Sequence, residues 1–247
     1  MSGRLFNEVI QNHRSIRQYT DQQVSDEIIK DLLQSAKSAS TSHNVQAYSI
    51  IIVRDVQKKK KLAELTGNQS YVEKCPVFFV LCADYYRLKK VSEWHNQPFE
   101  VNELEQVLVG GVDTALVAQN LLLAAEAYGL GGVMIGGIRN QPKEVAELLN
   151  LPKYTFPVMG LCIGYPAQSP ELKPRLPESA TIFYDEYNED QLEQAIKEYD
   201  QVTEAYYGAR TNSQKGEPWS KQMAQHLSKP NRAHLESFIK NQGFLKS

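Results

Sequence analysis

The sequence has few cysteines, and those present lack the spacing of a metal site. Its 247 residues include three, Cys75, Cys82 and Cys162, all in or beside apolar runs. An odd number of cysteines without ligand spacing is untypical of a disulfide framework or a zinc site. The five histidines show no metal-binding spacing either. We therefore expect buried, reduced thiols, no bound metal and a cytoplasmic location.

A dominant charge of one sign is also missing. The 27 Lys and Arg residues nearly balance 29 Asp and Glu residues, giving a formal net charge of −2. This balance does not favour nucleic acid as a partner. No apolar run approaches the roughly 20 residues that span a bilayer, and no signal-peptide core is present at the N-terminus. The sequence therefore predicts a soluble protein without nucleic-acid or membrane partners.

Internal repeats, low-complexity tracts and a clear interdomain linker are absent as well. We expect one α+β domain over residues 1–247, with a helical and irregular C-terminal excursion from about residue 189 to 247. Apolar periodicity and β-branched runs indicate the following elements. Helices are expected over 4–13, 25–39, 103–128, 189–207 and 235–239, and strands over 48–53, 77–83, 129–137 and 156–166.

The helix expected over residues 103–128 is apolar around most of its circumference. A helix of that kind is buried on most sides. In a chain of this size it indicates either the centre of a three-layer core or a packing surface between subunits.

A polar cluster lies where the first helix gives way to extended chain. Within five residues it holds His13, Arg14, Ser15 and Arg17. The two guanidinium groups are planar donor forks that suit a phosphate or the polar edge of a heteroaromatic ring. The alternative is an exposed basic helix end, because cations favour helix C-termini.

A second cationic cluster lies far downstream, at Lys173 and Arg175. Four prolines between Pro166 and Pro177 stiffen the surrounding chain. Residues two apart in extended chain can point to the same side, so the two cations suit a phosphate. An exposed charged loop is the alternative.

The glycine-rich stretch 129–137 does not fit a dinucleotide-binding fold. It follows a helix and flanks a strand, whereas the Rossmann fingerprint follows a strand and opens a helix. Glycines beside a buried strand allow either a tight turn or a ring stacked on the backbone. No nucleophile–base pair is apparent, since the adjacency of Ser42 and His43 does not make a catalytic triad. Redox chemistry would therefore come from a cofactor.

Four segments in order resemble the motifs of one family. They are His13-Arg14-Ser15-Ile16-Arg17, Thr66-Gly67-Asn68-Gln69, the stretch from Gly131 to Arg139, and the stretch from Gly164 to Pro177. Together the chain resembles the nitroreductase-like flavoproteins essentially end to end. The resemblance is closest to the NADPH-preferring branch, which contains oxygen-insensitive nitroreductases and NADPH–flavin oxidoreductases.

The resemblance implies a three-layer nitroreductase-like fold. Its mixed, mainly antiparallel sheet would be flanked by helices, in an intertwined homodimer with FMN at the interface. The helix over 103–128 would form the dimer core. Chemistry would occur at flavin N5, without a catalytic side chain. The FMN-binding residues implied by the resemblance are His13, Arg14, Ser15, Arg17, Ser40, Gln46, Gln69, Ile135, Gly136, Gly137, Lys173 and Arg175.

The same resemblance implies a reaction. NADPH would reduce bound FMN, and a nitroaromatic, quinone or flavin acceptor would then take the electrons in a ping-pong cycle. The residues implied for NADPH or substrate are Ser42, Arg210, Lys215 and Arg232. Two alternatives stay open: a dedicated flavin reductase that supplies reduced FMN, and a flavin-binding regulatory protein without turnover.

Overall fold

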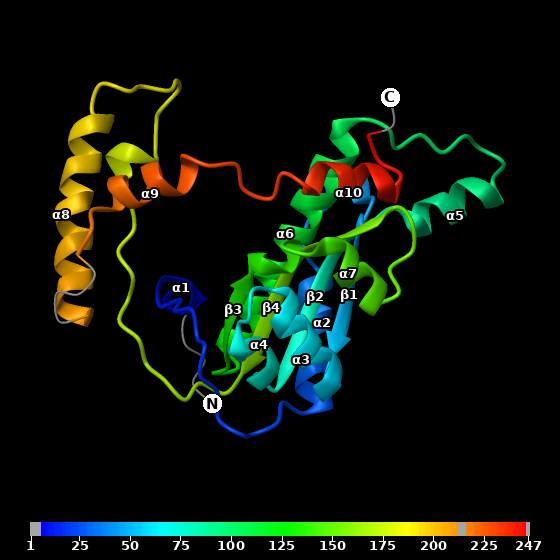
Figure 1. The fold of residues 1–247 in the computed structure, drawn as a ribbon, viewed down its shortest axis with the longest axis horizontal. Coiled ribbons are helices and arrows are strands. Elements are labelled where there is room, and N and C mark those ends of the chain that lie inside the picture. The colour runs from blue at the N-terminus through cyan, green and yellow to red at the C-terminus, as the bar shows by residue number, and fades with distance from the viewer. Residues whose placement is uncertain (1–5, 212–215, 246–247) are drawn as a thin grey trace. The chain divides into compact units, whose positions relative to one another are not determined.

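The computed structural model describes residues 6–211 and 216–245, with no side chains described at 210 and 211 (Figure 1). The chain divides into two compact units, residues 1–170 with 234–247 and residues 171–233. The single-domain organisation stays a prediction.

The helices of the first unit are α1 (Phe6–Gln11), α2 (Asp26–Lys37), α3 (Val56–Leu65), α4 (Ser70–Lys74), α5 (Tyr86–Trp94), α6 (Leu104–Ala127), α7 (Pro142–Leu148) and α10 (Leu235–Gln242), with 3-10 turns η1 (Ser42–Asn44) and η2 (Gly136–Arg139).

The sheet of the first unit has the strand order β1-β2-β4-β3, and every neighbouring pair is antiparallel. Its strands are β1 (Tyr48–Val53), β2 (Val77–Asp84), β3 (Gly131–Ile135) and β4 (Thr155–Gly164). A single parallel bridge joins Ser15 to Gly132, among the residues described. All eight residues of β2 are buried, as its continuous apolar run predicts for a central strand covered on both faces.

Alternating side chains of the sheet enter two separate cores. Phe79 and Leu81 pack with α2 and α6, whereas Phe78 and Val80 pack with α3, α4 and α7 on the other face. Side chains of successive strand residues point to opposite faces, so one strand serves both cores. The predicted three-layer α+β architecture is therefore confirmed, with helices on both sides of the sheet (Figure 1).

Helix α6 crosses the sheet beside α2, in the position expected of a central helix. By length and composition it could span a bilayer, since its most apolar window has a mean hydropathy of 1.6. That finding corrects the expectation that no segment reaches membrane length. Its contacts with the sheet and with α2 account for the apolar residues on its inner face.

The outer face of α6 is apolar and exposed. Leu104, Leu108, Val112 and Leu116, termed the outer row, recur every four residues and are 44% to 67% exposed. Residues four apart lie on one side of a helix, so the outer row is a continuous stripe. Contiguous exposed apolar surface of this kind is typical of an interaction site.

Short and charged helices are the elements that the sequence did not indicate. Helix α3 carries four consecutive lysines, and α4 and α7 span only five and seven residues. Their apolar stripes are too short to show a clear 3.6-residue period. The available signal at α3 is Asp55, whose carboxylate accepts a hydrogen bond from the Lys58 backbone N–H at 2.7 Å as an N-cap.

The second unit contains the turn η3 (Glu178–Ala180) and the helices α8 (Leu192–Thr211) and α9 (Trp219–Leu227). The two helices pack through an edge contact of Tyr199 with Trp219, with ring centroids 5.6 Å apart. The Asp200 carboxylate also accepts hydrogen bonds from the backbone and hydroxyl of Ser220. Helix α8 thus confirms the predicted helix over 189–207 and continues beyond it.

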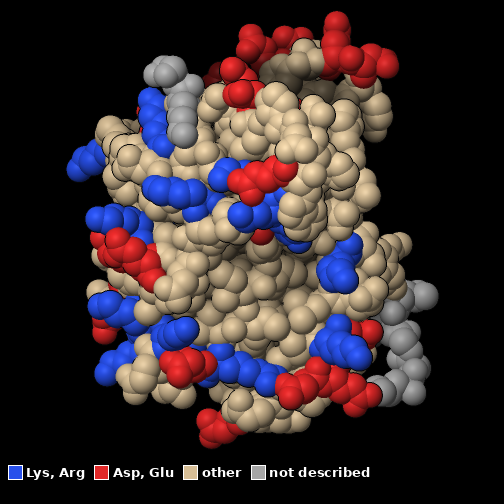
Figure 2. Space-filling view, turned by 90° about the vertical axis from the view of Figure 1, so that its right-hand side faces the viewer, with Lys and Arg blue, Asp and Glu red and all other residues tan. Residues whose placement is uncertain are grey.

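The charged side chains do not gather into a field of one sign on the face that Figure 2 shows. Lys and Arg residues lie interspersed with Asp and Glu residues there. Many such pairs lie within a single helix, for example Lys89 with Glu93 at 3.0 Å and Lys240 with Glu236 at 2.7 Å. Exposed pairs of this kind contribute little to stability, about 0.3–0.5 kcal/mol each.

Candidate functional site

The N-terminal cluster begins where α1 ends, as the sequence indicated. His13 Nδ1 lies 2.6 Å from Glu126 Oε1, near the end of α6. Glu126 is a residue that the sequence reasoning missed, because its partner lies 113 positions away in the chain. The contact fixes the His13 ring against α6 and sets the direction of the residues that follow.

Arg14 lines a cavity of about 350 Å³ together with Glu126 and the glycine-rich turn. Its Nη1 donates to the Asn12 carbonyl at 3.1 Å, but its Nε is buried without a hydrogen-bond partner. Glu126 Oε2 is likewise buried and unpartnered. A buried polar atom without a hydrogen-bond partner costs free energy unless a ligand or water satisfies it.

Ser15 and Ile16 join the cluster to the glycine-rich strand β3. The Ile16 N–H donates to the Gly132 carbonyl at 2.9 Å. A Cβ on Gly131 would lie 2.5 Å from Ile16 Cγ1, so only glycine permits this approach. The first and third motifs, distant in sequence, are therefore neighbours in the fold.

The second motif meets the third at Gln69 and Gly137. A Cβ on Gly137 would collide with the Thr66 carbonyl oxygen and lie 3.0 Å from Gln69 Nε2. The Tyr71 hydroxyl donates to Gln69 Oε1 at 2.9 Å, which fixes the orientation of the amide. Arg17 Cζ lies 5.9 Å from the Tyr71 ring centroid. Tyr71, a second residue that the sequence reasoning missed, thus brings together Arg17 and Gln69, and Gln69 in turn lies beside Gly137.

The remaining residues of the third motif continue this surface. Ile135 ends β3 and is buried, and Gly136 opens η2. A Cβ on Gly136 would meet Arg139 Nη2 at 3.3 Å. The strand expected over 129–137 is therefore shorter and turns into η2 at the two glycines.

The loop that carries Ser40, Ser42 and Gln46 is anchored elsewhere. All three residues are exposed, and in the part of the chain described, none of their hydrogen bonds reaches the other motifs. The backbone N–H of Ser42 instead donates to Asp113 Oδ1 of α6 at 3.0 Å. The signal for Asp113 in the sequence is a lone carboxylate in the middle of an apolar helix.

Lys173 and Arg175 belong to the second unit, where α8 holds their segment. The Tyr199 hydroxyl donates to the Pro174 carbonyl at 2.9 Å, and Lys173 Nζ lies 5.9 Å from the Tyr207 ring centroid. Burial raises the pKa of Tyr199, and the two nearby cations oppose that effect. Both cations are exposed and available to an anion.

The residues predicted for NADPH or substrate are only partly described. Lys215 and the side chain of Arg210 lie outside the described residues. Arg232 is half-buried in the second unit, with a left-handed backbone at φ 55°.

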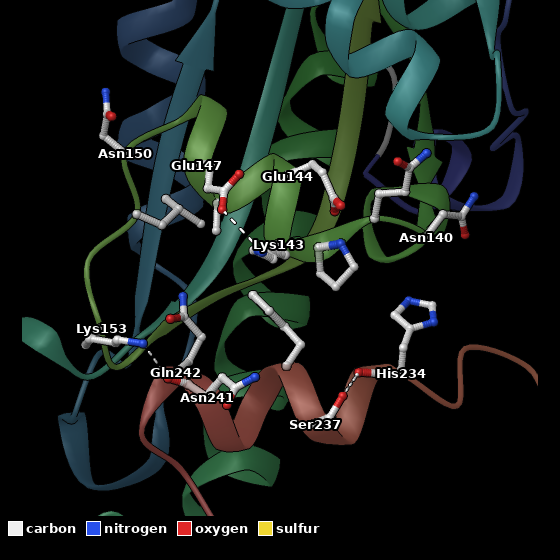
Figure 3. A pocket seen from close by; sticks show the side chains of 15 residues that line it. Asn140, Lys143, Glu144, Glu147, Asn150, Lys153, His234, Ser237, Asn241 and Gln242 are labelled. Atoms are coloured by element: carbon white, nitrogen blue, oxygen red, sulfur yellow. Dashed lines mark hydrogen bonds and ion pairs between the residues drawn. The ribbon is translucent and has the colours of Figure 1, made fainter.

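A separate cavity of about 850 Å³ lies between α7 and α10 (Figure 3). It has an apolar floor that includes Phe238 and Leu151. Its lysines are engaged, because Lys143 pairs with Glu147 at 3.8 Å and Lys153 donates to the Asn241 carbonyl at 2.6 Å. None of the residues predicted for FMN or NADPH lines it.

In the part of the chain that the structure describes, the first unit contains hydrogen-bond donors that have no acceptor within the protein. Arg14 Nε is buried without a partner, and Gln69 Nε2 faces the bare backbone of Gly137 while its Oε1 is already engaged. Phosphate oxygens and the heteroatom edge of a flavin are acceptors that suit such a set. The residues therefore fit FMN. No group of metal-ligating side chains is present among the described residues.

Comparison with known proteins finds family models, relatives and solved structures that are similar to this chain over most of its length. Residues 10–165 match the model of the nitroreductase family, and residues 173–247 match the model of the nitroreductase family C-terminal domain. A Cr(VI) reductase of Pseudomonas sp. is 44% identical over 96% of this chain and 98% of its own. An FMN reductase (NADPH) of Bacillus subtilis is 44% identical over 97% and 98%. The solved structure of the NfrA1 nitroreductase of B. subtilis has a TM-score of 0.95 and 42% identity, covering 98% of this chain and 100% of that one.

Proposed function

The chain belongs to the nitroreductase family, and from that premise we propose that it is an FMN-dependent NADPH oxidoreductase. The observation that carries the proposal is the meeting of Arg17 and Gln69 at Tyr71, with Gln69 Nε2 next to Gly137. It combines a cation and an oriented amide donor beside a glycine turn. A few placed polar groups of this kind suit the binding and orientation of a planar heterocycle.

FMN when bound would accept a hydride from NADPH and pass two electrons to an acceptor. The chain's own residues bind and orient it. Gly136 is partly exposed and would lie beside the ring, whereas Gly137 is buried against the Thr66 carbonyl, and Gln69 would donate to a ring heteroatom. The residues proposed to hold the phosphate, ribityl chain and ring are His13, Arg14, Ser15, Arg17, Ser40, Gln46, Gln69, Ile135, Gly136, Gly137, Lys173 and Arg175.

A homodimer forms part of the proposal. The outer row of α6 is an exposed apolar stripe of four residues on one face of a helix. A second copy of the chain would bury it by pairing the same face of both helices, as a two-fold interface requires. The loop with Ser40 and Gln46 is anchored to α6 through Asp113, the residue that follows Val112 of the outer row. The site would then be completed across the interface.

NADPH is the proposed reductant. Its 2′-phosphate calls for cations, which Arg210, Lys215 and Arg232 supply in the second unit, and Ser42 would contact the reactants from the loop. Nitroaromatics, quinones and free flavin are the proposed acceptors, in a cytoplasmic enzyme whose thiols stay reduced. The flavin-reductase alternative is favoured by one observation, the relative named FMN reductase (NADPH).

The absorbance of the purified protein tests first whether it binds FMN and whether NADPH reduces that FMN. Purified protein should carry FMN absorbance, and NADPH should bleach it in the absence of air. Steady-state rates with a nitrofuran and with free FMN then rank the two kinds of acceptor. A bound flavin that NADPH does not reduce would instead identify a regulatory flavin-binding protein, and a chain that binds no FMN would refute the proposal.

A further inference from the structure

The loop between α2 and β1 has a backbone that its own residues do not favour. His43, Asn44 and Gln46 all have positive φ, at 46°, 56° and 53°. Asparagine and histidine adopt this left-handed region more often than other residues with a side chain, whereas glutamine does so at a cost. Three such residues within four positions persist only where surrounding structure over-determines them.

One side chain supplies that constraint. The backbone N–H of Ser42 donates to Asp113 Oδ1 at 3.0 Å, and the N–H of Ala47 donates to Oδ2 at 3.1 Å. The two donors bracket the left-handed run from both ends. A single carboxylate thus fixes the distance between the start of η1 and the start of β1, where the chain re-enters the sheet.

The burial of Asp113 makes this arrangement costly. Its side chain is 1% exposed, and among the described residues it forms no ion pair with Lys, Arg or His. A buried carboxylate without a counterion is strongly disfavoured unless hydrogen bonds to the charge compensate for lost hydration. Its neighbours Val117 and Ala118 are fully buried apolar residues, so the helix itself does not need a carboxylate here.

We propose that Asp113 is a positioning residue, which holds the 42–47 loop in its left-handed form so that Ser42 and Gln46 face the reactants. The inference rests on the proposed function, because the roles of Ser42 and Gln46 come from it. Asp113 contacts neither cofactor nor substrate in this scheme. It acts through the backbone of the loop.

Asp113→Asn is the variant that tests the proposal. An asparagine amide presents one acceptor and one NH₂ group, so one of the two loop N–H groups would face a donor. The loop should lose one charge-assisted bond and relax from the left-handed form. Thr114→Val is the matched control, because the Thr114 hydroxyl is buried on the same helix and donates only to the Gly110 carbonyl.

Two measurements on the full-length, FMN-loaded protein separate the possibilities. Hydrogen exchange of residues 41–48 should quicken about tenfold or more in Asp113→Asn, the factor for one lost charge-assisted bond. Residues 77–84 of β2 should keep their protection. KM for NADPH should rise by a similar factor with a much smaller change in kcat, and Thr114→Val should change neither.

Three outcomes would overturn the inference. These are unchanged exchange in the loop, loss of protection in β2 to the same extent as in the loop, and a loosened loop with unchanged KM. If the wild-type protein bound no FMN and did not oxidise NADPH, the proposed function would be refuted instead. The exchange measurement would still report whether Asp113 holds the loop, so the two failures remain distinguishable.

Discussion

Replacing Leu108 and Val112 with glutamate should convert the proposed homodimer into monomers. Both side chains lie in the outer row of α6 and are 59% and 48% exposed in the single chain. Pairing of two copies would remove most of this surface from water. Glutamate at the same positions would place carboxylates opposite one another across a two-fold axis.

The size of the effect follows from that exposure. Complete burial of a Leu or Val side chain stabilises by about 1.5–3 kcal/mol, so burial of the exposed half is worth about 1 kcal/mol. Two side chains on each of two protomers therefore contribute about 4 kcal/mol. Like-charge repulsion and carboxylate desolvation add to the loss. The dissociation constant should weaken by at least about 10³-fold, since 4.1 kcal/mol corresponds to that factor.

Sedimentation velocity over a range of concentrations measures this directly. The wild type should sediment at roughly twice the 28.0 kDa chain mass, and the double variant near the chain mass. Val56→Glu is the matched control, because Val56 is 62% exposed on α3 and lies outside the outer row. Circular dichroism checks that each variant is folded. A double variant that stays dimeric, or a control that dissociates equally, would refute the reasoning.

Other predictions address the cofactor, the coenzyme and the thiols. Arg17→Ala should weaken FMN binding by about 1–3 kcal/mol in a fluorescence titration, as expected for a lost charge-assisted bond. Gly137→Ala should lower both Tm and flavin affinity because its Cβ would meet backbone, whereas Gly208→Ala, with open space around it, should lower neither. Arg210→Ala should reduce kcat/KM for NADPH about 10- to 150-fold and leave NADH nearly unchanged, and equal losses would exclude a role at the 2′-phosphate. A thiol reagent should react only after denaturation, even at pH 9, because burial raises the thiol pKa of Cys82 and Cys162.

The strands and the central helix could be predicted because their signal is local. A continuous apolar run such as Val77–Ala83 has few alternatives in a chain of this size, and the structure confirms it within one residue as β2. Helix α6 is equally plain, at Leu104–Ala127 against an expected 103–128. Helices α4 and α7 were missed because so few residues cannot display a period, and their stability comes from packing on the sheet.

The candidate site was predictable as a set of segments but not as a set of contacts. The resemblance named residues in four motifs, yet it gave no reason why they should meet. For the first three motifs the structure supplies part of that reason, and residues outside the predicted set anchor them and the loop: Glu126 for His13, Tyr71 for Gln69, and Asp113 for the loop. Each of these contacts depends on the tertiary fold or on a side-chain orientation, which no periodicity in the sequence encodes.

Several local conflicts in the first unit lie at the proposed FMN segments, and others lie outside them, at Asn96, Asn150 and Tyr154. Positive φ occurs at His43, Asn44 and Gln46 in one segment and at Asn68 beside Gln69 in another. The buried unpartnered atoms Arg14 Nε and Glu126 Oε2 lie at a third. Sequences that fold well avoid such features unless function retains them, so those at the proposed FMN segments agree with a functional role there. A bound flavin that accepts a hydrogen bond from Arg14 Nε would relieve part of this cost, and FMN should therefore raise the thermal stability of the chain as well as supply its chemistry.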